Sequence, residues 1–248
     1  MLAVIRITIL TLALGLISIY TCLYSLLRPF HPNNVRHAAA LLGKLSKVIG
    51  LEVEVRLPPE LKGVGPVVYI CNHQNSYDIF TISGAVQAMT VSIGKKSLKW
   101  IPFFGQMYWL TGNILIDRAN TSKALGTIDL AAKKIKEKGI SVWLFPEGTR
   151  SYGRGLLPFK TGAFRTAIQA EVPIVPVCAS NTHNVIDLNR WNNGKMIIEF
   201  LPPVRLSATD KSGIRESTNQ VRETMLEKII ELSHEAGTEL PQNVKKVK

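Results

Sequence analysis

The chain has 248 residues, of which 46% are hydrophobic and 19% are charged, and 30 Lys and Arg residues against 18 Asp and Glu residues give a formal net charge of +12. So much apolar composition excludes intrinsic disorder, because a buried core can offset the entropy of the chain, and the length suits one domain with an appendage or two small domains. The mean hydropathy is nevertheless positive at +0.13, and this combination is typical of proteins that face anionic lipids, phosphorylated substrates or nucleic acid.

The N-terminal segment contains an uncharged run without proline, Ile7 to Leu27. At about 1.5 Å of rise per residue, a helix over this run is long enough for a hydrocarbon core of roughly 30 Å. A cleaved signal peptide would have a shorter apolar region and a small-residue cleavage site. We therefore expect a membrane anchor.

Basic residues flank this run asymmetrically. Before it there is only Arg6, whereas Arg28, Arg36, Lys44 and Lys47 follow it. The positive-inside rule therefore predicts that the larger C-terminal part lies on the cytoplasmic side of the membrane.

A second stretch near the N-terminus, His37 to Ile49, carries apolar residues on roughly one helical face. A helical hairpin that dips into one leaflet is thus an alternative to a full span, and the sequence leaves both open. We divide the chain into a membrane-anchoring segment, residues 1–50, and a domain on the cytoplasmic face, residues 51–248.

The three cysteines, Cys22, Cys71 and Cys178, lie far apart and form no CxxC pair. This spacing argues against zinc or iron–sulfur ligation, and an odd, sparse set argues against a disulfide framework. We expect three small apolar side chains in a reducing compartment, and no metal site.

After residue 50, short apolar runs rich in β-branched residues alternate with stretches of helical pattern. Alternation of this kind predicts an α/β fold, a single domain with a central, mostly buried mixed sheet flanked by helices and preceded by the N-terminal membrane-anchoring helix or helical hairpin. The expected strands are Val53–Val55, Val67–Cys71, Met89–Ile93, Asn113–Ile116, Ile140–Phe145, Pro173–Cys178 and Met196–Phe200. The expected helices are Tyr77–Ala88, Thr121–Lys138, Thr161–Ala170 and Gly213–Ala236.

The second of these strands runs directly into an Asn-His-Gln-Asn-Ser-Tyr-Asp sequence that contains His73 and Asp78. On a continuous helix, five residues rotate the side chains by about 500°, which leaves them about 140° apart. The two can meet only if His73 precedes the helix and Asp78 lies in its first turn. A carboxylate there would hold one imidazole nitrogen and leave the other free to take a proton. The alternative is a capping histidine beside an unrelated aspartate.

A His–Asp pair of this type usually activates a serine, but the sequence contains no GxSxG motif. The substrate's own hydroxyl group then takes the place of the serine, which points to acyl transfer onto an alcohol.

The strand Ile140–Phe145 leads into a Phe-Pro-Glu-Gly-Thr-Arg sequence. Arg150 at its end could bind a phosphate in a bidentate manner, and Glu147 could hold a glycerol hydroxyl or orient the arginine. A third strand end supplies Arg118. A single arginine is more often a solvated surface charge, but two at strand ends near the His–Asp pair indicate an anion site.

Four segments in order, residues 72–78, 112–118, 145–150 and 172–177, resemble the four sequence blocks of the glycerolipid acyltransferases, a family with an NHxxxxD motif. The resemblance is closest to the bacterial branch that acylates 1-acyl-sn-glycerol 3-phosphate, and it extends over nearly the whole chain. The last 40 or so residues carry no motif.

The resemblance implies transfer of a fatty acyl group from acyl-CoA or acyl carrier protein to the 2-hydroxyl of lysophosphatidic acid, which yields phosphatidic acid. His73 would be the general base and Asp78 its orienting partner. The phosphoglycerol end would be bound by Arg118, Glu147, Gly148, Thr149 and Arg150.

The same resemblance implies no cofactor, no metal and no covalent acyl-enzyme, since a thioester is already activated. The implied partners are membrane lipid, lysophosphatidic acid and the acyl donor, at the cytoplasmic side of a bacterial inner membrane. The choice between the two donors, the acyl-chain length and the oligomeric state are left open.

The sequence leaves two alternative functions open. The first is acylation of glycerol 3-phosphate at sn-1, or of another lysophospholipid, with the same His–Asp pair. The second is a non-catalytic basic membrane adaptor, which would need the charge but not the pair. An acidic bilayer surface, the phosphorylated acceptor and the anionic acyl donor are targets for the +12 charge, so nucleic acid is not needed to explain it.

Between the first two blocks lies an aromatic cluster, for which core packing and an interfacial surface or the mouth of an acyl tunnel are both open. It consists of Trp100, Phe103, Phe104, Tyr108 and Trp109.

Overall fold

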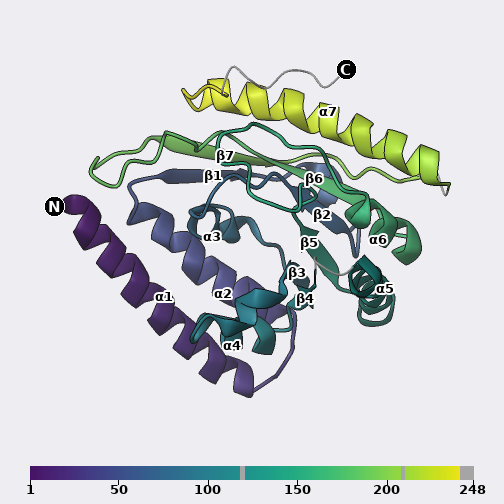
Figure 1. Cartoon of the computed structure of the whole chain (residues 1–248), viewed down its shortest axis with the longest axis horizontal. Helices are drawn as coiled ribbons and strands as arrows, with labels where there is room; N and C mark the ends of the chain where they lie inside the picture. The colour runs from purple at the N-terminus through teal and green to yellow at the C-terminus, as the bar shows by residue number, and fades with distance from the viewer. Residues whose placement is uncertain (118–120, 208–209, 241–248) are drawn as a thin grey trace.

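Seven strands form one mixed sheet with helices on both faces (Figure 1). This computed structural model describes residues 1–117, 121–207 and 210–240, without the side chains of residues 121–124. The strand order is β1-β7-β6-β2-β5-β3-β4. The strands are β1 (Glu52–Arg56), β2 (Val68–Cys71), β3 (Thr90–Lys95), β4 (Ile114–Ile116), β5 (Ser141–Leu144), β6 (Ile174–Ala179) and β7 (Lys195–Phe200).

Strand β2 lies at the centre of the sheet, parallel to β5 on one side and to β6 on the other. Val68 is opposite Val142 and Ile174 in the two pairings. β3 and β4 continue the parallel part beyond β5, and only the β6–β7 pairing is antiparallel among the described strand pairs. The carboxyl ends of β2, β5 and β6 therefore meet at one edge, where sites gather in such sheets.

The central strand is apolar on both faces, as expected for a parallel strand between two layers of helices. Val68 and Ile70 join a core cluster with side chains of the helices that follow residue 120. Tyr69 and Cys71 join a second cluster on the opposite face. The expected fold class, an α/β domain with a mostly buried mixed sheet, is confirmed.

The helices divide between the two faces of the sheet. The C-terminal helix α7 (Lys211–Glu235) covers one face, as Figure 1 shows, together with α5 (Thr121–Lys138) and α6 (Gly162–Ala170). The other face is covered from the N-terminal side of the chain by α1 (Leu2–Leu26), α2 (Asn33–Gly43), α3 (Asp78–Thr81) and α4 (Phe104–Leu110).

Two of the expected helices differ in the structure. The expected helix Tyr77–Ala88 is only one turn, α3, followed by a short 3-10 turn, Ser83–Ala85. Here the backbone of Gly84 lies against Gly43 of α2, so close that a Cβ on Gly43 would lie 2.6 Å from the Gly84 Cα atom. Packing against α2 thus sets the local conformation in place of the helical pattern.

The second difference concerns the expected helix His37–Ile49. Helix α2 begins four residues earlier, at Asn33, and ends at Gly43, and a 3-10 helix, Lys44–Lys47, continues it. Helix α4 was not expected, because its aromatic sequence has no clear amphipathic period.

Helix α1 exposes apolar side chains and buries polar ones. Leu12, Leu16 and Leu23 are each more than 60% exposed, whereas Ser18 and Thr21 are fully buried against the neighbouring helices. By length and composition alone, α1 could cross a membrane.

Candidate active site

The side chains of His73 and Asp78 meet at the carboxyl end of β2. His73 Nδ1 lies 2.6 Å from Asp78 Oδ2. As the spacing requires, Asp78 is the first residue of α3 and His73 lies in the loop before it. The same carboxylate oxygen accepts hydrogen bonds from the backbone N–H groups of Gln74 (2.7 Å) and Asn75 (3.2 Å). Asp78 is only 4% exposed, so its orientation is fixed by the loop that it closes.

The imidazole ring of His73 stacks on Phe145, which follows β5, with ring centroids 4.1 Å apart and an interplanar angle of 19°. Because Nδ1 faces Asp78, Nε2 is the nitrogen left for the cavity that His73 lines. A neutral imidazole held in this way can accept a proton at Nε2.

The loop that carries His73 is bonded to the segment after β6. Asn72 exchanges two hydrogen bonds with the Ala179 backbone, each 2.9 Å. Gln74 donates to Ser180 O (2.8 Å) and accepts from Thr182 N (2.7 Å). Two polar side chains thus fix this loop to the neighbouring strand end.

The same loop is bonded to the segment after β5. Ser151 N donates to His73 O (2.8 Å), and Tyr152 N donates to Gln74 O (2.9 Å). The first and third sequence blocks are therefore side by side, and backbone hydrogen bonds connect the two loops that form this part of the site.

Gly148 is required where it stands, in the turn after β5. Its φ is +70°, and a Cβ there would lie 2.9 Å from the Lys160 side chain. Gly148, Thr149 and Lys160 line the same cavity as His73.

Arg150 also lines this cavity. Its Nη1 donates to the Tyr152 hydroxyl (3.1 Å), while its buried Nε has no hydrogen-bond partner among the described residues. Hydrogen bonds from Arg150 and Ser76 lower the pKa of Tyr152. A guanidinium in the wall of a cavity can bind an oxyanion. Tyr152 is a site residue that the sequence did not single out, because no pattern distinguishes it from a surface tyrosine.

Glu147 lies beneath this surface, not on it. It is 4% exposed, and its two oxygens accept from His73 N (2.6 Å) and Leu157 N (2.9 Å). Burial raises the pKa of Glu147 to about 7, against the opposing effect of the two backbone hydrogen bonds. Its contacts are with backbone, and it is absent from the described lining of the cavity.

Arg118 lies outside the described residues, so its expected place in the anion site stays a prediction. Among the side chains that the structure describes, no three His, Cys, Asp or Glu group closely enough to hold a metal ion.

The cavity beside His73 has a volume of about 870 Å³, within the range of ligand pockets, roughly 300 to 1,000 Å³. Charged and polar groups line the part near His73 and Arg150. The remainder is formed by several elements, among them α2, β3 and α4, and mixes apolar side chains with polar ones such as Ser92, Lys95 and Asn113. Its apolar lining includes Ala38, Ala39, Leu42, Ile93, Leu98 and Met107.

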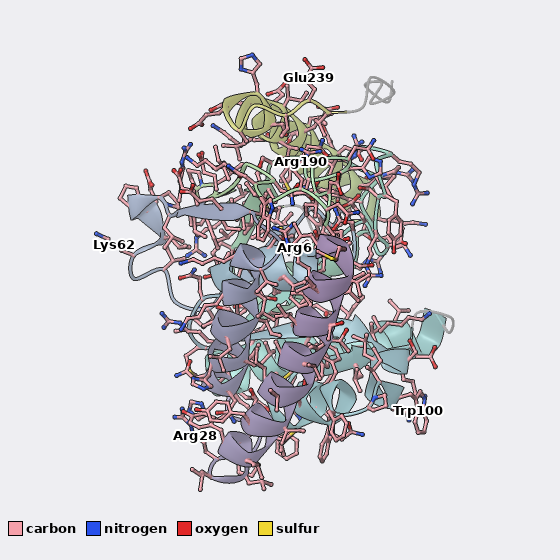
Figure 2. All side chains as sticks on the ribbon, turned by 90° about the vertical axis from the view of Figure 1, so that its left-hand side faces the viewer. Arg6, Arg28, Lys62, Trp100, Arg190 and Glu239 are labelled. Carbon is pink, nitrogen blue, oxygen red and sulfur yellow. The ribbon has the colours of Figure 1, made fainter. Side chains whose placement is uncertain are left out.

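The members of the aromatic cluster differ in where they lie, and the two roles that the sequence left open stay open. Phe104 and Tyr108 line the cavity. Trp100, Phe103 and Trp109 are 75%, 55% and 56% exposed, and Figure 2 shows Trp100 projecting from the surface.

The family model described as Acyltransferase matches residues 52–180. This range contains the described site residues from His73 to Arg150.

The chain is also similar over almost its full length to curated proteins. It is 50% identical to the 1-acyl-sn-glycerol-3-phosphate acyltransferases of Salmonella typhimurium and Escherichia coli, over 96% of this chain and 97% of each relative. It is 33% identical to the human 1-acyl-sn-glycerol-3-phosphate acyltransferase alpha, over 81% of this chain and 71% of the relative.

A similar fold is found in the crystal structure of the 1-acyl-sn-glycerophosphate acyltransferase from Thermotoga maritima. The TM-score is 0.71 at 22% sequence identity, and the match covers 92% of this chain and 94% of the other.

Proposed function

The chain belongs to the acyltransferase family, and from this premise we propose that it transfers a fatty acyl group from an acyl thioester to the 2-hydroxyl of 1-acyl-sn-glycerol 3-phosphate, lysophosphatidic acid. The observation that carries the proposal is the 2.6 Å contact between His73 and Asp78, both of which line the large cavity. The names of the relatives support the choice of acceptor.

In this proposal His73 Nε2 takes the proton of the 2-hydroxyl as the oxygen attacks the thioester carbonyl. The C–O bond forms, the C–S bond breaks, and the imidazolium returns the proton to the leaving thiolate. Asp78 orients the ring and stabilises its positive charge. A thioester is already activated, so positioning and this proton transfer suffice for turnover without an acyl-enzyme.

We assign the phosphate of the acceptor to Arg150, with Gly148, Thr149 and Arg118 contributing. The place of Arg150 in the cavity lining supports this assignment, since phosphate oxygens are strong acceptors for arginine. The apolar part of the cavity would hold a fatty acyl chain away from water.

We further propose that α1 lies in one leaflet. Both of its ends are bonded to the same body: Arg6 donates to the carbonyl oxygens of Leu188 (3.1 Å) and Trp191 (2.9 Å), and Phe30 N, just after α1, donates to Leu110 O (2.9 Å). Figure 2 shows α1 beside α2, with Arg6 at the end near Arg190 and Arg28 at the other. A full span would place one end across the bilayer from its partners. The charge asymmetry of the flanking residues favours the cytoplasmic leaflet.

The full-length protein in detergent micelles or isolated membranes tests the proposed reaction. Thiol release from acyl-CoA and formation of phosphatidic acid are measured with lysophosphatidic acid, and acyl carrier protein replaces the CoA ester in a parallel assay. His73→Ala is expected to abolish both signals, while His234→Ala, at an exposed position of α7, is expected to keep them.

Full turnover by His73→Ala would contradict the proposed base. Acylation of glycerol 3-phosphate but not of lysophosphatidic acid would contradict the proposed acceptor and favour the sn-1 reaction instead.

A further inference from the structure

We propose that Glu147 and Arg222 are positioning residues of this site, which hold Leu157 from both sides of its backbone and thereby fix the backbone of His73. The inference rests on the proposed function, because it assigns both residues to the geometry of the proposed base. It gives helix α7, which lies beyond the residues matched by the family model, a part in the site.

The first half of the arrangement is Glu147. One carboxylate oxygen accepts from His73 N at 2.6 Å, and the other accepts from Leu157 N at 2.9 Å. Both oxygens are thus engaged with backbone groups. Glu147 lines a small cavity with a volume of about 20 Å³, which has room for a water molecule and not for a phosphoglycerol group.

The second half is Arg222, which projects from α7 and is 8% exposed. Its Nε donates to Leu157 O at 3.0 Å, and its Nη2 donates to Leu156 O. Leu157 is therefore held at its N–H by Glu147 and at its carbonyl by Arg222. The guanidinium also lies in the electrostatic field of Glu147, which opposes the lowering of the Arg222 pKa by burial.

The electrostatics favour a geometric role over a purely stabilising one. Charged groups with 4% and 8% exposure have lost most of their hydration, and apolar residues of similar shape often stabilise such a place at least as well. What apolar residues cannot do is accept from two backbone N–H groups or donate to two carbonyl oxygens in fixed directions.

The consequence falls on His73. Its N–H is held by Glu147 and its carbonyl by Ser151 N, while its ring is held by Asp78. If Arg222 releases Leu157, Glu147 loses its fixed position and the His73 backbone loses one of its two bonds. The reacting groups then lose alignment, which lowers kcat and leaves the binding of the acceptor largely intact.

The test compares Arg222→Met, Arg222→Lys and Arg215→Met in the full-length protein, since Arg215 is an exposed arginine on the same helix. We expect Arg222→Met to lower kcat 10- to 100-fold per folded molecule, with less than a threefold change in KM for lysophosphatidic acid. Arg222→Lys keeps a donor and is expected to regain part of kcat, and Arg215→Met is expected to match the wild type. Thermal melting reports the folded fraction of each variant.

Glu147→Gln separates positioning from substrate binding. The amide side chain keeps one acceptor but presents N–H donors to the other backbone N–H. A drop in kcat at constant acceptor KM supports the proposal, whereas a rise in acceptor KM at constant kcat would make Glu147 a substrate ligand and overturn it.

A readout without substrate keeps this inference apart from the proposed reaction. Hydrogen exchange is measured for peptides that contain residues 72–76 and 151–158. Faster exchange in Arg222→Met than in Arg215→Met supports the positioning role even if the wild type does not acylate lysophosphatidic acid. Equal exchange and equal kcat in these two variants would overturn it, and an inactive wild type would overturn only the proposed function.

Discussion

At the scale of single residues, two buried carboxylates organise one loop. Asp78 accepts from the N–H groups of Gln74 and Asn75 and holds the ring of His73, and Glu147 accepts from the His73 N–H. Each N–H bond to a carboxylate is stronger than a neutral one. The imidazole is therefore fixed in position by its backbone as well as by its ring contact, before any substrate binds.

The first residue-scale prediction concerns Arg150. Loss of one charge-assisted interaction with a phosphate costs about 1.5–3 kcal/mol, or roughly a 10- to 100-fold change in affinity. Arg150→Ala is therefore expected to raise KM for lysophosphatidic acid by about this factor, with a much smaller change in KM for the acyl donor. Arg205→Ala, at an exposed position outside the described cavity lining, is the control. Equal effects of Arg150→Ala on both substrates would count against the assigned phosphate site.

The second residue-scale prediction follows from the buried carboxylate of Glu147. Its pKa is raised from 4.5 to about 7, mainly by burial. Between these values the folded state holds a proton that the unfolded state has lost, so this group makes the protein less stable as the pH rises through the window. The full effect is about 3 kcal/mol, which corresponds to a fall in Tm of very roughly 5–10 °C.

The measurement is Tm in detergent micelles from pH 5 to pH 8. The Tm of the wild type is expected to fall relative to that of Glu147→Gln, which has no proton to lose. Parallel curves for the two proteins would show that Glu147 does not titrate in this range.

The sequence predicts some of these residues and not others, for physical reasons. His73 and Asp78 are close in the chain, and the turn of a helix limits how they can meet, so their contact could be foreseen. Arg222 follows His73 by about 150 residues and reaches the site only because α7 packs on the sheet. The position of Arg222 in the helical pattern of α7 predicts that the side chain is buried. It does not predict which groups the side chain contacts.

At the scale of elements, the strands were predictable because each is a short apolar run between polar turns, and buried parallel strands have this pattern. Helix α5 was also expected with its observed bounds. The expected helix from Tyr77 to Ala88 was too long, because contact with α2 at Gly84 is a tertiary effect that local pattern does not contain.

One prediction belongs to helix α2, which forms part of the apolar cavity wall. Ala39 is buried and lines the cavity, whereas its neighbour Ala40 is exposed. Ala39→Phe is expected to fill part of the cavity and to shift the donor preference toward shorter acyl chains. Competition among acyl-CoA esters of 12 to 18 carbons measures this (an assay range set by the common fatty acids), with Ala40→Phe as the matched control. If Ala39→Phe and Ala40→Phe show the same acyl-chain length preference, the acyl chain does not lie against Ala39.

At the scale of the whole molecule, the apolar excess and the charge excess occupy different parts of the structure. About half of the large exposed apolar side chains in the described part of the chain are on α1 and near its C-terminal end, where Leu27 and Phe30 are 85% and 47% exposed and Phe30 packs edge-on against Trp109. The surface that we expect to face a membrane is thus built from α1 together with α4. The expected boundary at residue 50 between a membrane-anchoring segment and the domain stays a prediction. Helix α2, which lies before this boundary, also forms a wall of the cavity.

The last prediction distinguishes a helix in one leaflet from a full span. Ala3 N donates to Asn189 Oδ1 at 3.1 Å, and the buried guanidinium of Arg6 donates to three carbonyl oxygens of residues 188–191. A span would break these bonds and require the guanidinium to find new partners near the bilayer, at a cost of several kcal/mol. The N-terminus is therefore expected on the same side as the catalytic domain.

Single cysteines at Ala3 and at the exposed Lys62 of the domain report the two sides, in a Cys22→Ala background that leaves the buried Cys71 and Cys178. In inverted inner-membrane vesicles, a membrane-impermeant maleimide is expected to label both positions, and in intact spheroplasts neither. Labelling of Ala3→Cys from the outside while Lys62→Cys is labelled only in inverted vesicles would establish a span instead. Because Arg6 could not keep its carbonyl partners in that topology, Arg6→Met would then be expected to leave Tm unchanged, whereas the single-leaflet arrangement predicts a clear loss of stability from the same substitution.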